Sequence, residues 1–159
     1  MFNISCIAAL IVGGLGPSYV VGEILTPEIY IPSTNKSCTL PDLPDRRRYS
    51  SLDGNLLCGG MHRKPSPGPR STCIKFDFTS GAWTSAYTLD VERWKHVSWT
   101  PQSGSGTYLM GNYNWRNANT TSLLKPDGTV ESGFSLRWKL RFAIKVFVSS
   151  VKHKDLHFL

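Results

Sequence analysis

The sequence predicts an all-β fold, and three observations support this prediction. Aromatic residues make up 11% of the 159 residues, with five Trp, and strands accommodate such side chains well. Fourteen Gly and ten Pro interrupt short apolar runs, as the turns between strands require. Similar segments recur about every 46 residues, and none of them has the period of a helix. A chain of this length fits a single domain.

The repeat is visible when the chain is aligned with itself. The offset is 45 between Arg48-Tyr49 and Arg93-Trp94. It is 46 between EIYIPSTNK and IKFDFTSGA, and 46 again between LIVGG and LLCGG. LLCGG and YLMGN are 52 residues apart because residues 102–106 lengthen a turn, and hairpin loops tolerate such insertions. We therefore expect three units built in the same order.

Each unit is expected to contain short strands joined by tight turns. In the middle unit, the predicted strands are 48–52, 55–58, 72–78 and 82–89. Asp53-Gly54 is a strong hairpin signal between the first two, and 61–70 is expected to be a loop. The next unit predicts strands at 94–100, 107–110 and 121–125, with a turn at 126–128. An incomplete first unit predicts strands at 8–14, 26–32 and 37–40.

Residues 1–22 also allow a second interpretation. Their apolar core is typical of a signal peptide, yet no Lys or Arg precedes it. Gly13, Gly14 and Gly16 interrupt the apolar run too early for a transmembrane helix, so no membrane span is expected. The strand and the signal peptide both stay open, and the strand is favoured because it continues the repeat.

Gly59-Gly60 follows the predicted second strand, Tyr30 and Phe76 lie in the third, and Trp83 begins the fourth. This placement of glycines and aromatics resembles the Kelch repeat, in which each repeat forms one blade of a β-propeller. NKSCTLPDLPD and LLCGG resemble the secreted-type repeats, with Cys in place of some aromatics. The third unit departs from the pattern, because Gly111-Asn112 replaces the glycine pair.

The resemblance implies a partial propeller of four-stranded antiparallel blades over residues 8–143. It divides into a partial blade at 8–47 and full blades at 48–92 and 93–140. Residues 144–159 lack the pattern and are interpreted as an atypical basic tail. A propeller closes with about four to eight blades. Blades without neighbours expose apolar surface, so a fragment or a self-associating chain is expected.

The net charge of +7 is concentrated near the C-terminus. Residues 137–159 hold six basic residues against one acidic residue, for +5, which leaves +2 for the first 136. A nucleic-acid-binding body would carry its basic residues across the domain. The distribution therefore argues against nucleic acid as a partner.

The four cysteines favour a disulfide over a metal site. They form no CxxC pair, and Cys58 with His62 lacks a second pair of zinc ligands, so no metal or other cofactor is expected. Cys58 ends one predicted strand and Cys73 lies in its antiparallel neighbour, where bridging is geometrically allowed. Closing this loop of about 15 residues would stabilise the fold by about 3 kcal/mol.

The remaining side chains point to binding and not to catalysis. The glycine pairs are interpreted as turns, and His96 as a packed or solvent-facing residue. The aromatics at repeat positions are interpreted as packing between blades; these are Tyr49, Phe76, Trp83, Trp94 and Trp99. No histidine has a carboxylate and a nucleophile in a catalytic pattern, so no enzyme is expected.

Loops after second and fourth strands should share one face of a propeller, and this face is the predicted partner-binding site. Its residues are Arg46, Arg47, Arg63, Lys64, Arg70, Tyr113, Trp115 and Arg116. Arg with exposed aromatics is the composition of interface hot spots. The predicted function is a non-catalytic protein-interaction module whose partner is an acidic protein or a glycan.

Two alternatives remain from other functional classes: a secreted lectin-like propeller and a galactose-oxidase-like copper enzyme. Stabilisation by sugar would favour the first, and bound copper the second. Sequons at Asn3, Asn35 and Asn119 favour an extracellular location over a cytoplasmic one.

Overall fold

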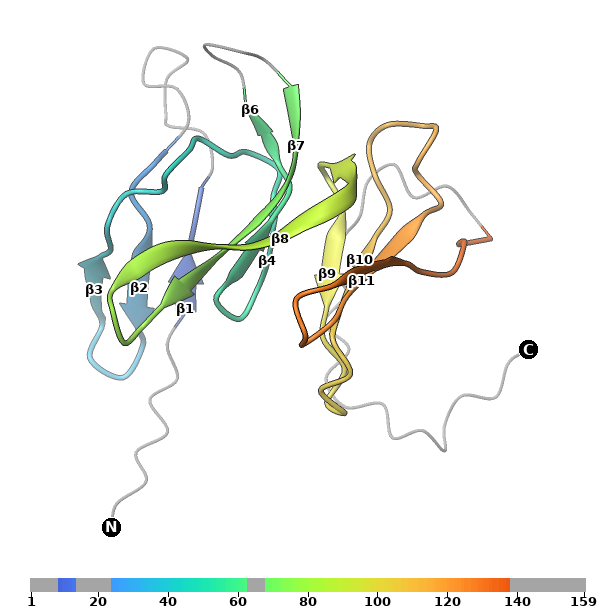
Figure 1. The fold of residues 1–159 in the computed structure, drawn as a ribbon. Helices are drawn as coiled ribbons and strands as arrows, with labels where there is room; N and C mark the ends of the chain where they lie inside the picture. The colour runs from blue at the N-terminus through green and yellow to red at the C-terminus, as the bar shows by residue number, and fades with distance from the viewer. Residues whose placement is uncertain (1–8, 14–23, 63–67, 138–159) are drawn as a thin grey trace.

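The protein is all-β in the residues that the computed structural model describes, which are 9–13, 24–62 and 68–137 (Figure 1). Their strands form three antiparallel sheets, and no barrel closes within these residues. The all-β prediction is confirmed. The alternative of a signal peptide and the predicted basic tail concern segments that lie largely or wholly outside the described residues.

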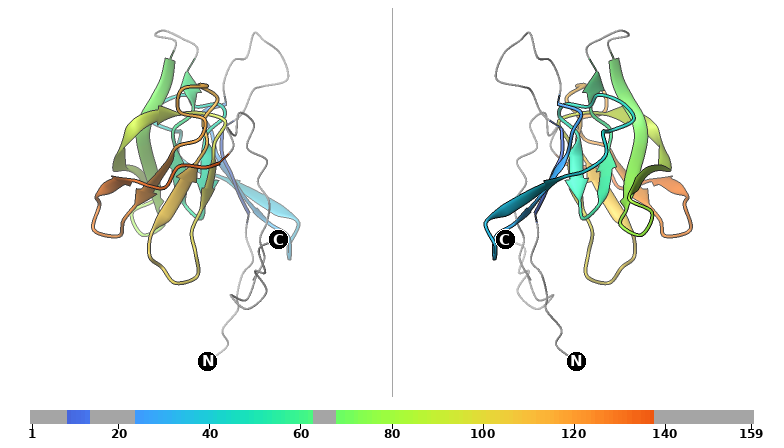
Figure 2. Two further views of the ribbon diagram at one scale, coloured as in Figure 1. Left: turned by 90° about the vertical axis from the view of Figure 1, so that its right-hand side faces the viewer. Right: turned by 90° about the vertical axis from the view of Figure 1, so that its left-hand side faces the viewer.

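The three sheets follow one another along the chain and lie side by side in that order in Figure 1, and Figure 2 shows the molecule from the two ends of this row. The first contains β1 (Ala9–Ile11), β2 (Glu28–Ile31) and β3 (Lys36–Thr39). The second contains β4 (Ser51–Asp53), β5 (Leu56–Cys58), β7 (Gly68–Asp77) and β8 (Ala82–Arg93), with β6 (Met61–His62) paired to the start of β7. The third contains β9 (Val97–Trp99), β10 (Thr107–Met110), β11 (Thr121–Leu124) and β12 (Val130–Ser132).

Strand pairing has the same register in the first two sheets. Leu10 lies opposite Ile29 in the first sheet, and Leu56 lies opposite Lys75 in the second. Both residues of the second pair stand 46 positions after their counterparts in the first. The next pair of strands repeats this shift, with Tyr30 opposite Ser37 and Phe76 opposite Trp83. Register is set by the hydrophobic pattern and the turns. The repeated residue pattern therefore corresponds to a repeated backbone.

The residues before the first strands of the second and third sheets correct one predicted alignment. Tyr49 and Lys95 both have positive φ, 58° and 54°, and are 46 residues apart. Arg47 therefore corresponds to Arg93, and the offset of 45 from Arg48 was wrong by one residue. A non-glycine residue at positive φ is incompatible with extended backbone. For this reason β4 and β9 begin later than predicted, at Ser51 and Val97.

Two other strand boundaries also differ from the prediction. The segment 61–70 was expected to be a loop, but β6 pairs with the start of β7, with Met61 opposite Pro69. The fourth strand continues beyond Leu89 to Arg93. Hydrogen bonding between sheet neighbours thus extends strands into segments whose proline content or polarity predicted loops.

The glycine pair is a turn and also a contact between sheets. Gly59 and Gly60 have φ of 59° and 102°, and the Gly60 N–H donates to the carbonyl of Arg93 at 2.8 Å. A Cβ on Gly59 would overlap this carbonyl oxygen, and one on Gly13 would stand 2.8 Å from the carbonyl oxygen of Arg47. Each glycine therefore allows the chain that leads into the first strand of the next sheet to approach closely.

Among the described residues, the core consists of two apolar clusters. One contains Leu43, Leu57 and Ile74, and Trp83 packs against it. The other contains Leu89, Leu109 and Leu124 together with the cysteine pair. Cys58 and Cys73 are cross-strand partners on β5 and β7, and their Sγ atoms lie 2.10 Å apart. The predicted disulfide is confirmed.

Candidate functional site

Arg47 is a buried structural residue and does not lie on an exposed face, where the sequence analysis places it. Its side chain is 2% exposed. Nη1 donates to the carbonyl of Thr72 at 2.6 Å, and Nη2 donates to the Thr72 hydroxyl at 2.8 Å. Nε pairs with the carboxylate of Asp45 at 2.5 Å. A guanidinium with these partners satisfies backbone and side-chain acceptors inside the second sheet and offers nothing to a ligand.

Arg93, the last residue of β8, makes the equivalent contacts with the third sheet. Its side chain is fully buried, and Nη1 donates to the carbonyls of Gly111 and Thr120 at 3.0 and 3.1 Å. Nη2 donates to Ser122 Oγ at 2.7 Å, and Ser122 in turn donates to Asp90. Burial lowers the pKa of Arg93, and the Asp90 carboxylate opposes this shift. Arg47 Nη1 likewise donates to the carbonyl of Gly59 at 3.3 Å, so in both cases the arginine fixes the glycine turn to the third strand of the sheet.

His96 is packed between the second and third sheets. Its ring is 5% exposed, and Nε2 lies 2.7 Å from the hydroxyl of Ser51 on β4. Burial, and then the charge of Arg93, lowers the pKa of His96 to about 3. The imidazole is therefore neutral at physiological pH and joins two sheets, which is the packed one of the two roles that the sequence left open for it.

Aromatic and basic side chains gather on the face that carries the glycine turns. The Nζ atom of Lys95 lies 4.5 Å from the ring centroid of Tyr113, 4.8 Å from that of Tyr49 and 5.7 Å from that of Trp94. These distances are within the range of cation–π interactions. We call the whole group the aromatic–basic surface; it comprises Arg48, Tyr49, Trp94, Lys95, Tyr113, Trp115 and Arg116.

The surface joins two sheets. Tyr49 precedes β4, Trp94 and Lys95 precede β9, and the Tyr49 and Trp94 centroids are 6.2 Å apart. Trp94 and Tyr113 have centroids 4.2 Å apart. The positive φ of Tyr49 and Lys95 turns the chain at equivalent positions of the two repeats and places both side chains at the boundary. Non-glycine residues in this conformation are common where function constrains the backbone.

The loop after β10 is held by Asn112, which replaces the second glycine of the pair. Its Nδ2 donates to the carbonyl of Glu92 at 2.6 Å, and its Oδ1 accepts the N–H of Asn114 at 3.3 Å. The Tyr113 N–H donates to the carbonyl of Trp94 at 2.9 Å. The side chain of Asn112 is fully buried, so it anchors a loop whose aromatic residues stay outside.

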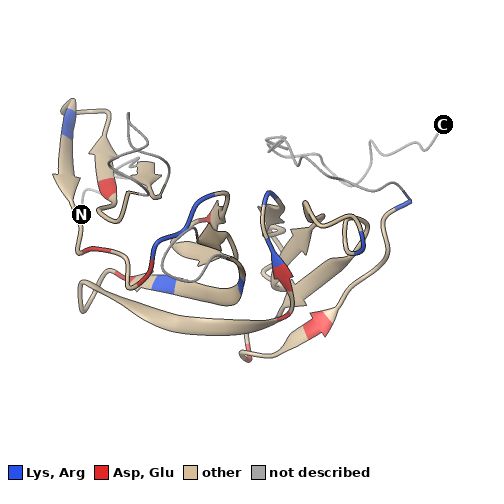
Figure 3. Ribbon diagram, turned by 90° about the horizontal axis from the view of Figure 1, so that it is seen from above, with Lys and Arg blue, Asp and Glu red and all other residues tan. Residues whose placement is uncertain are grey.

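Three of the predicted binding residues lie on this loop and are exposed. Tyr113 is 38% exposed and Trp115 is 55% exposed, and the Arg116 guanidinium lies 5.7 Å from the Trp115 ring centroid. Figure 3 looks onto this side of the molecule and marks its basic positions. The structure therefore brings Tyr113, Trp115 and Arg116 into one surface, as the sequence predicts.

The other predicted binding residues divide into two groups. Arg46 is half-buried in the connection that precedes β4, and Arg70 lies on β7 with its Nε 3.5 Å from Asp45 Oδ2. Arg63 and Lys64 lie outside the described residues.

Sequence reasoning missed Tyr49, Trp94 and Lys95 as surface residues. Tyr49 and Trp94 were expected to pack between blades; they do meet at the boundary between two sheets, but Tyr49 is 42% exposed. Trp99, also predicted to pack between blades, is 47% exposed and stacks on Tyr108 of its own sheet. The signal for Lys95 was its alignment with Tyr49, which the offset of 45 concealed.

Within the described ranges, no group of three or more His, Cys, Asp or Glu could hold a metal ion. No helix among these residues is long and apolar enough to cross a membrane. Comparison with protein-family models and with curated proteins finds no match. Function must therefore be argued from the residues of this chain.

Proposed function

We propose that the three sheets are blades of a Kelch-type β-propeller and that the chain is a non-catalytic protein-interaction module. Three features support a propeller: the strand registers repeat, a glycine turn recurs after the second strand, and an arginine is buried at this turn in the second and third sheets. Propeller blades repeat a four-stranded antiparallel unit radially. The second and third sheets each contain four strands that pair in the order of the sequence, and β6 is an additional short strand of the second sheet.

The observation that carries the binding proposal is the aromatic–basic surface. Three rings from two sheets surround the ammonium group of Lys95, and Trp115 and Arg116 extend the surface on the neighbouring loop. Trp, Tyr and Arg are the residues most enriched in interface hot spots. Rings held by each other and by a backbone anchor lose little conformational freedom when a partner binds. The surface is thus suited to a macromolecular partner.

The chemistry of this surface favours an acidic polypeptide segment. Arg48, Lys95 and Arg116 place positive charge beside exposed rings. Carboxylates of a partner would form charge-assisted hydrogen bonds with these groups, and apolar side chains would cover the rings. Association through such a surface slows as ionic strength rises, because salt screens the attraction that guides the encounter.

The proposal can be tested by selecting peptides from a random display library against the full chain. The enriched peptides should combine Asp or Glu with aromatic or aliphatic residues, and their association rates should fall with added salt. Combined replacement of Tyr113, Trp115 and Arg116 by Ala should weaken their binding by about 100-fold, the effect of losing a small hot spot.

The matched control is Phe78→Ala, because Phe78 is 62% exposed and follows β7 at the opposite end of the sheet. This substitution should leave peptide affinity unchanged. Enrichment of peptides without acidic residues, or equal loss of binding in the two variants, would count against the proposal.

A further inference from the structure

A cleft opens on the side of the molecule opposite the aromatic–basic surface. Its volume is about 390 Å³, within the range of small-molecule sites. It lies between the turn that joins β4 to β5 and the hairpin that joins β9 to β10. The residues on which its chemistry depends are Asp53, Leu56, Lys75, Tyr87, Thr100 and Thr107.

One wall of the cleft is a chain of hydrogen bonds between two sheets. The Thr100 hydroxyl donates to Asp53 Oδ2 at 2.8 Å, so the Thr107 hydroxyl, 2.7 Å away, is the donor to Thr100. Asp53 Oδ1 has no donor among the described residues, and the Asp53 side chain is half-buried. This wall therefore presents a fixed carboxylate oxygen that can accept from a ligand hydroxyl.

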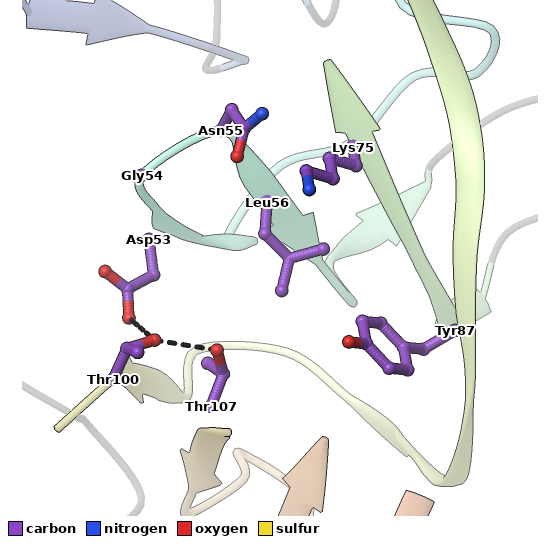
Figure 4. A pocket seen from close by; sticks show the side chains of 8 residues that line it. All are labelled: Asp53, Gly54, Asn55, Leu56, Lys75, Tyr87, Thr100 and Thr107. Carbon is purple, nitrogen blue, oxygen red and sulfur yellow. Dashed lines mark hydrogen bonds between the residues drawn. The ribbon is translucent and has the colours of Figure 1, made fainter. Parts of the chain in front are cut away.

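The middle of the cleft is apolar. The side chain of Leu56 lies between Asp53 on one side and Lys75 and Tyr87 on the other (Figure 4). The Tyr87 hydroxyl donates to the carbonyl of Lys125 at 3.0 Å, and this bond fixes the ring at the edge of the cleft. Leu56 and the Tyr87 ring together offer an apolar surface to one face of a flat ligand.

The opposite wall carries a positive charge. Lys75 is exposed on β7, and no carboxylate pairs with its ammonium group within the described part of the chain. Its carbonyl accepts a bond from Thr84, but this bond does not involve the side chain. A negatively charged group on a ligand would therefore find a free cation across the cleft from Asp53.

We propose that this cleft binds an acidic monosaccharide, a six-membered sugar ring that bears one carboxylate. Lys75 would bind the sugar carboxylate, while Asp53 Oδ1 would accept from ring hydroxyls. Leu56 and Tyr87 would cover the C–H face of the ring, which is the apolar side of a sugar. A neutral sugar would leave Lys75 without a counter-charge, and a simple carboxylate would leave Asp53 and the apolar middle unused.

The test is a titration of the full chain with D-glucuronate, followed by saturation-transfer NMR. A ligand of this size should bind with a dissociation constant on the order of 1 mM. Glucose should bind about tenfold more weakly, and so should glucuronate to Lys75→Met or Asp53→Asn, because each change removes a charge-assisted hydrogen bond. The methyl glycoside of glucuronate distinguishes the source of the sugar. Its binding indicates a sugar linked within a glycan, and its exclusion indicates the free sugar.

Lys36→Met is the matched control, because Lys36 is an exposed strand lysine of the first sheet, outside the cleft. It should bind glucuronate as the unaltered chain does. The combined alanine variant of Tyr113, Trp115 and Arg116 should also bind glucuronate with unchanged affinity. The result of this test is therefore independent of the protein-binding proposal. Absence of glucuronate binding, equal competition by acetate, or unchanged affinity in both cleft variants would overturn it.

Discussion

Replacing Arg93 by Met should remove the link between the glycine turn and the third strand of the third sheet. Met has a similar length and fills much of the same space, but it has no hydrogen-bond donor. Arg93 donates to two carbonyls and to Ser122 from a fully buried position. The substitution therefore removes donors and leaves their acceptors in place.

The acceptors that Arg93 leaves behind differ in whether they keep another hydrogen-bond partner. The Thr120 carbonyl keeps its bond from the Gly111 N–H, and Ser122 keeps its bond to Asp90. The Gly111 carbonyl has no other donor among the described residues, and a buried acceptor without a donor costs about 1–3 kcal/mol. Asp90 also loses its neighbouring charge. We expect the free energy of unfolding to fall by about 3 kcal/mol, the lower end of the range for breaking a buried charged network.

Urea unfolding of the full chain, followed by tryptophan fluorescence, measures this change. Lys36→Met is the control, since it removes an exposed charge and should change stability by less than about 0.5 kcal/mol. Arg93→Lys should be intermediate, because an ammonium group cannot reach all the acceptors of the guanidinium. If Arg93→Met costs no more than the control, the proposed structural role of the buried arginine is wrong.

Three other predictions concern stability. Gly54→Ala and Gly59→Ala both place a side chain at a positive φ, but only Gly59 lies close to another backbone segment. The free energy of unfolding in urea should therefore be lower for Gly59→Ala than for Gly54→Ala by about 1–3 kcal/mol. Equal losses in the two variants would contradict the close approach. The pKa of His96 is lowered from 6.5 to about 3, so the unfolded chain binds protons more readily than the folded one. The free energy of unfolding should therefore fall from pH 6.5 toward pH 3 by up to about 1.4 kcal/mol per pH unit. Thermal melts at several pH values should show a weaker dependence for His96→Gln. Reduction of Cys58–Cys73 should lower the free energy of unfolding by about 3 kcal/mol, and a double alanine variant should be insensitive to reductant.

Local sequence features predicted much of the fold. Asp53-Gly54 forms the expected hairpin, with Asp53 paired to Leu56. Asn35 and Gly81, aligned by the repeat, both adopt positive φ. The segment 8–14, expected to be the second strand of the incomplete first blade, contains β1, at Ala9–Ile11. These features depend on the period of apolar residues and on turn chemistry, which neighbouring residues determine.

The candidate site was only partly predictable. Tyr113, Trp115 and Arg116 are adjacent in sequence, and their loop position follows from the glycine turn that precedes them. The burial of Arg47 could not be predicted, because an arginine beside two others in a polar connection gives no sign of burial. Its burial depends on Thr72, 25 residues away, whose carbonyl and hydroxyl accept its hydrogen bonds.

The sequence by itself determined the β-class, the repeat, the turns and the cysteine pair, because residue period and turn residues act over a few positions. Only the tertiary structure decided which equivalent residues face solvent and which are buried. Lys95 and Arg93 are two residues apart and both basic, yet one lies among surface rings and the other inside a sheet. The positive φ of Lys95 directs its side chain to the surface, whereas the hydrogen-bond acceptors of the third sheet hold Arg93 inside. Both effects depend on how neighbouring sheets meet.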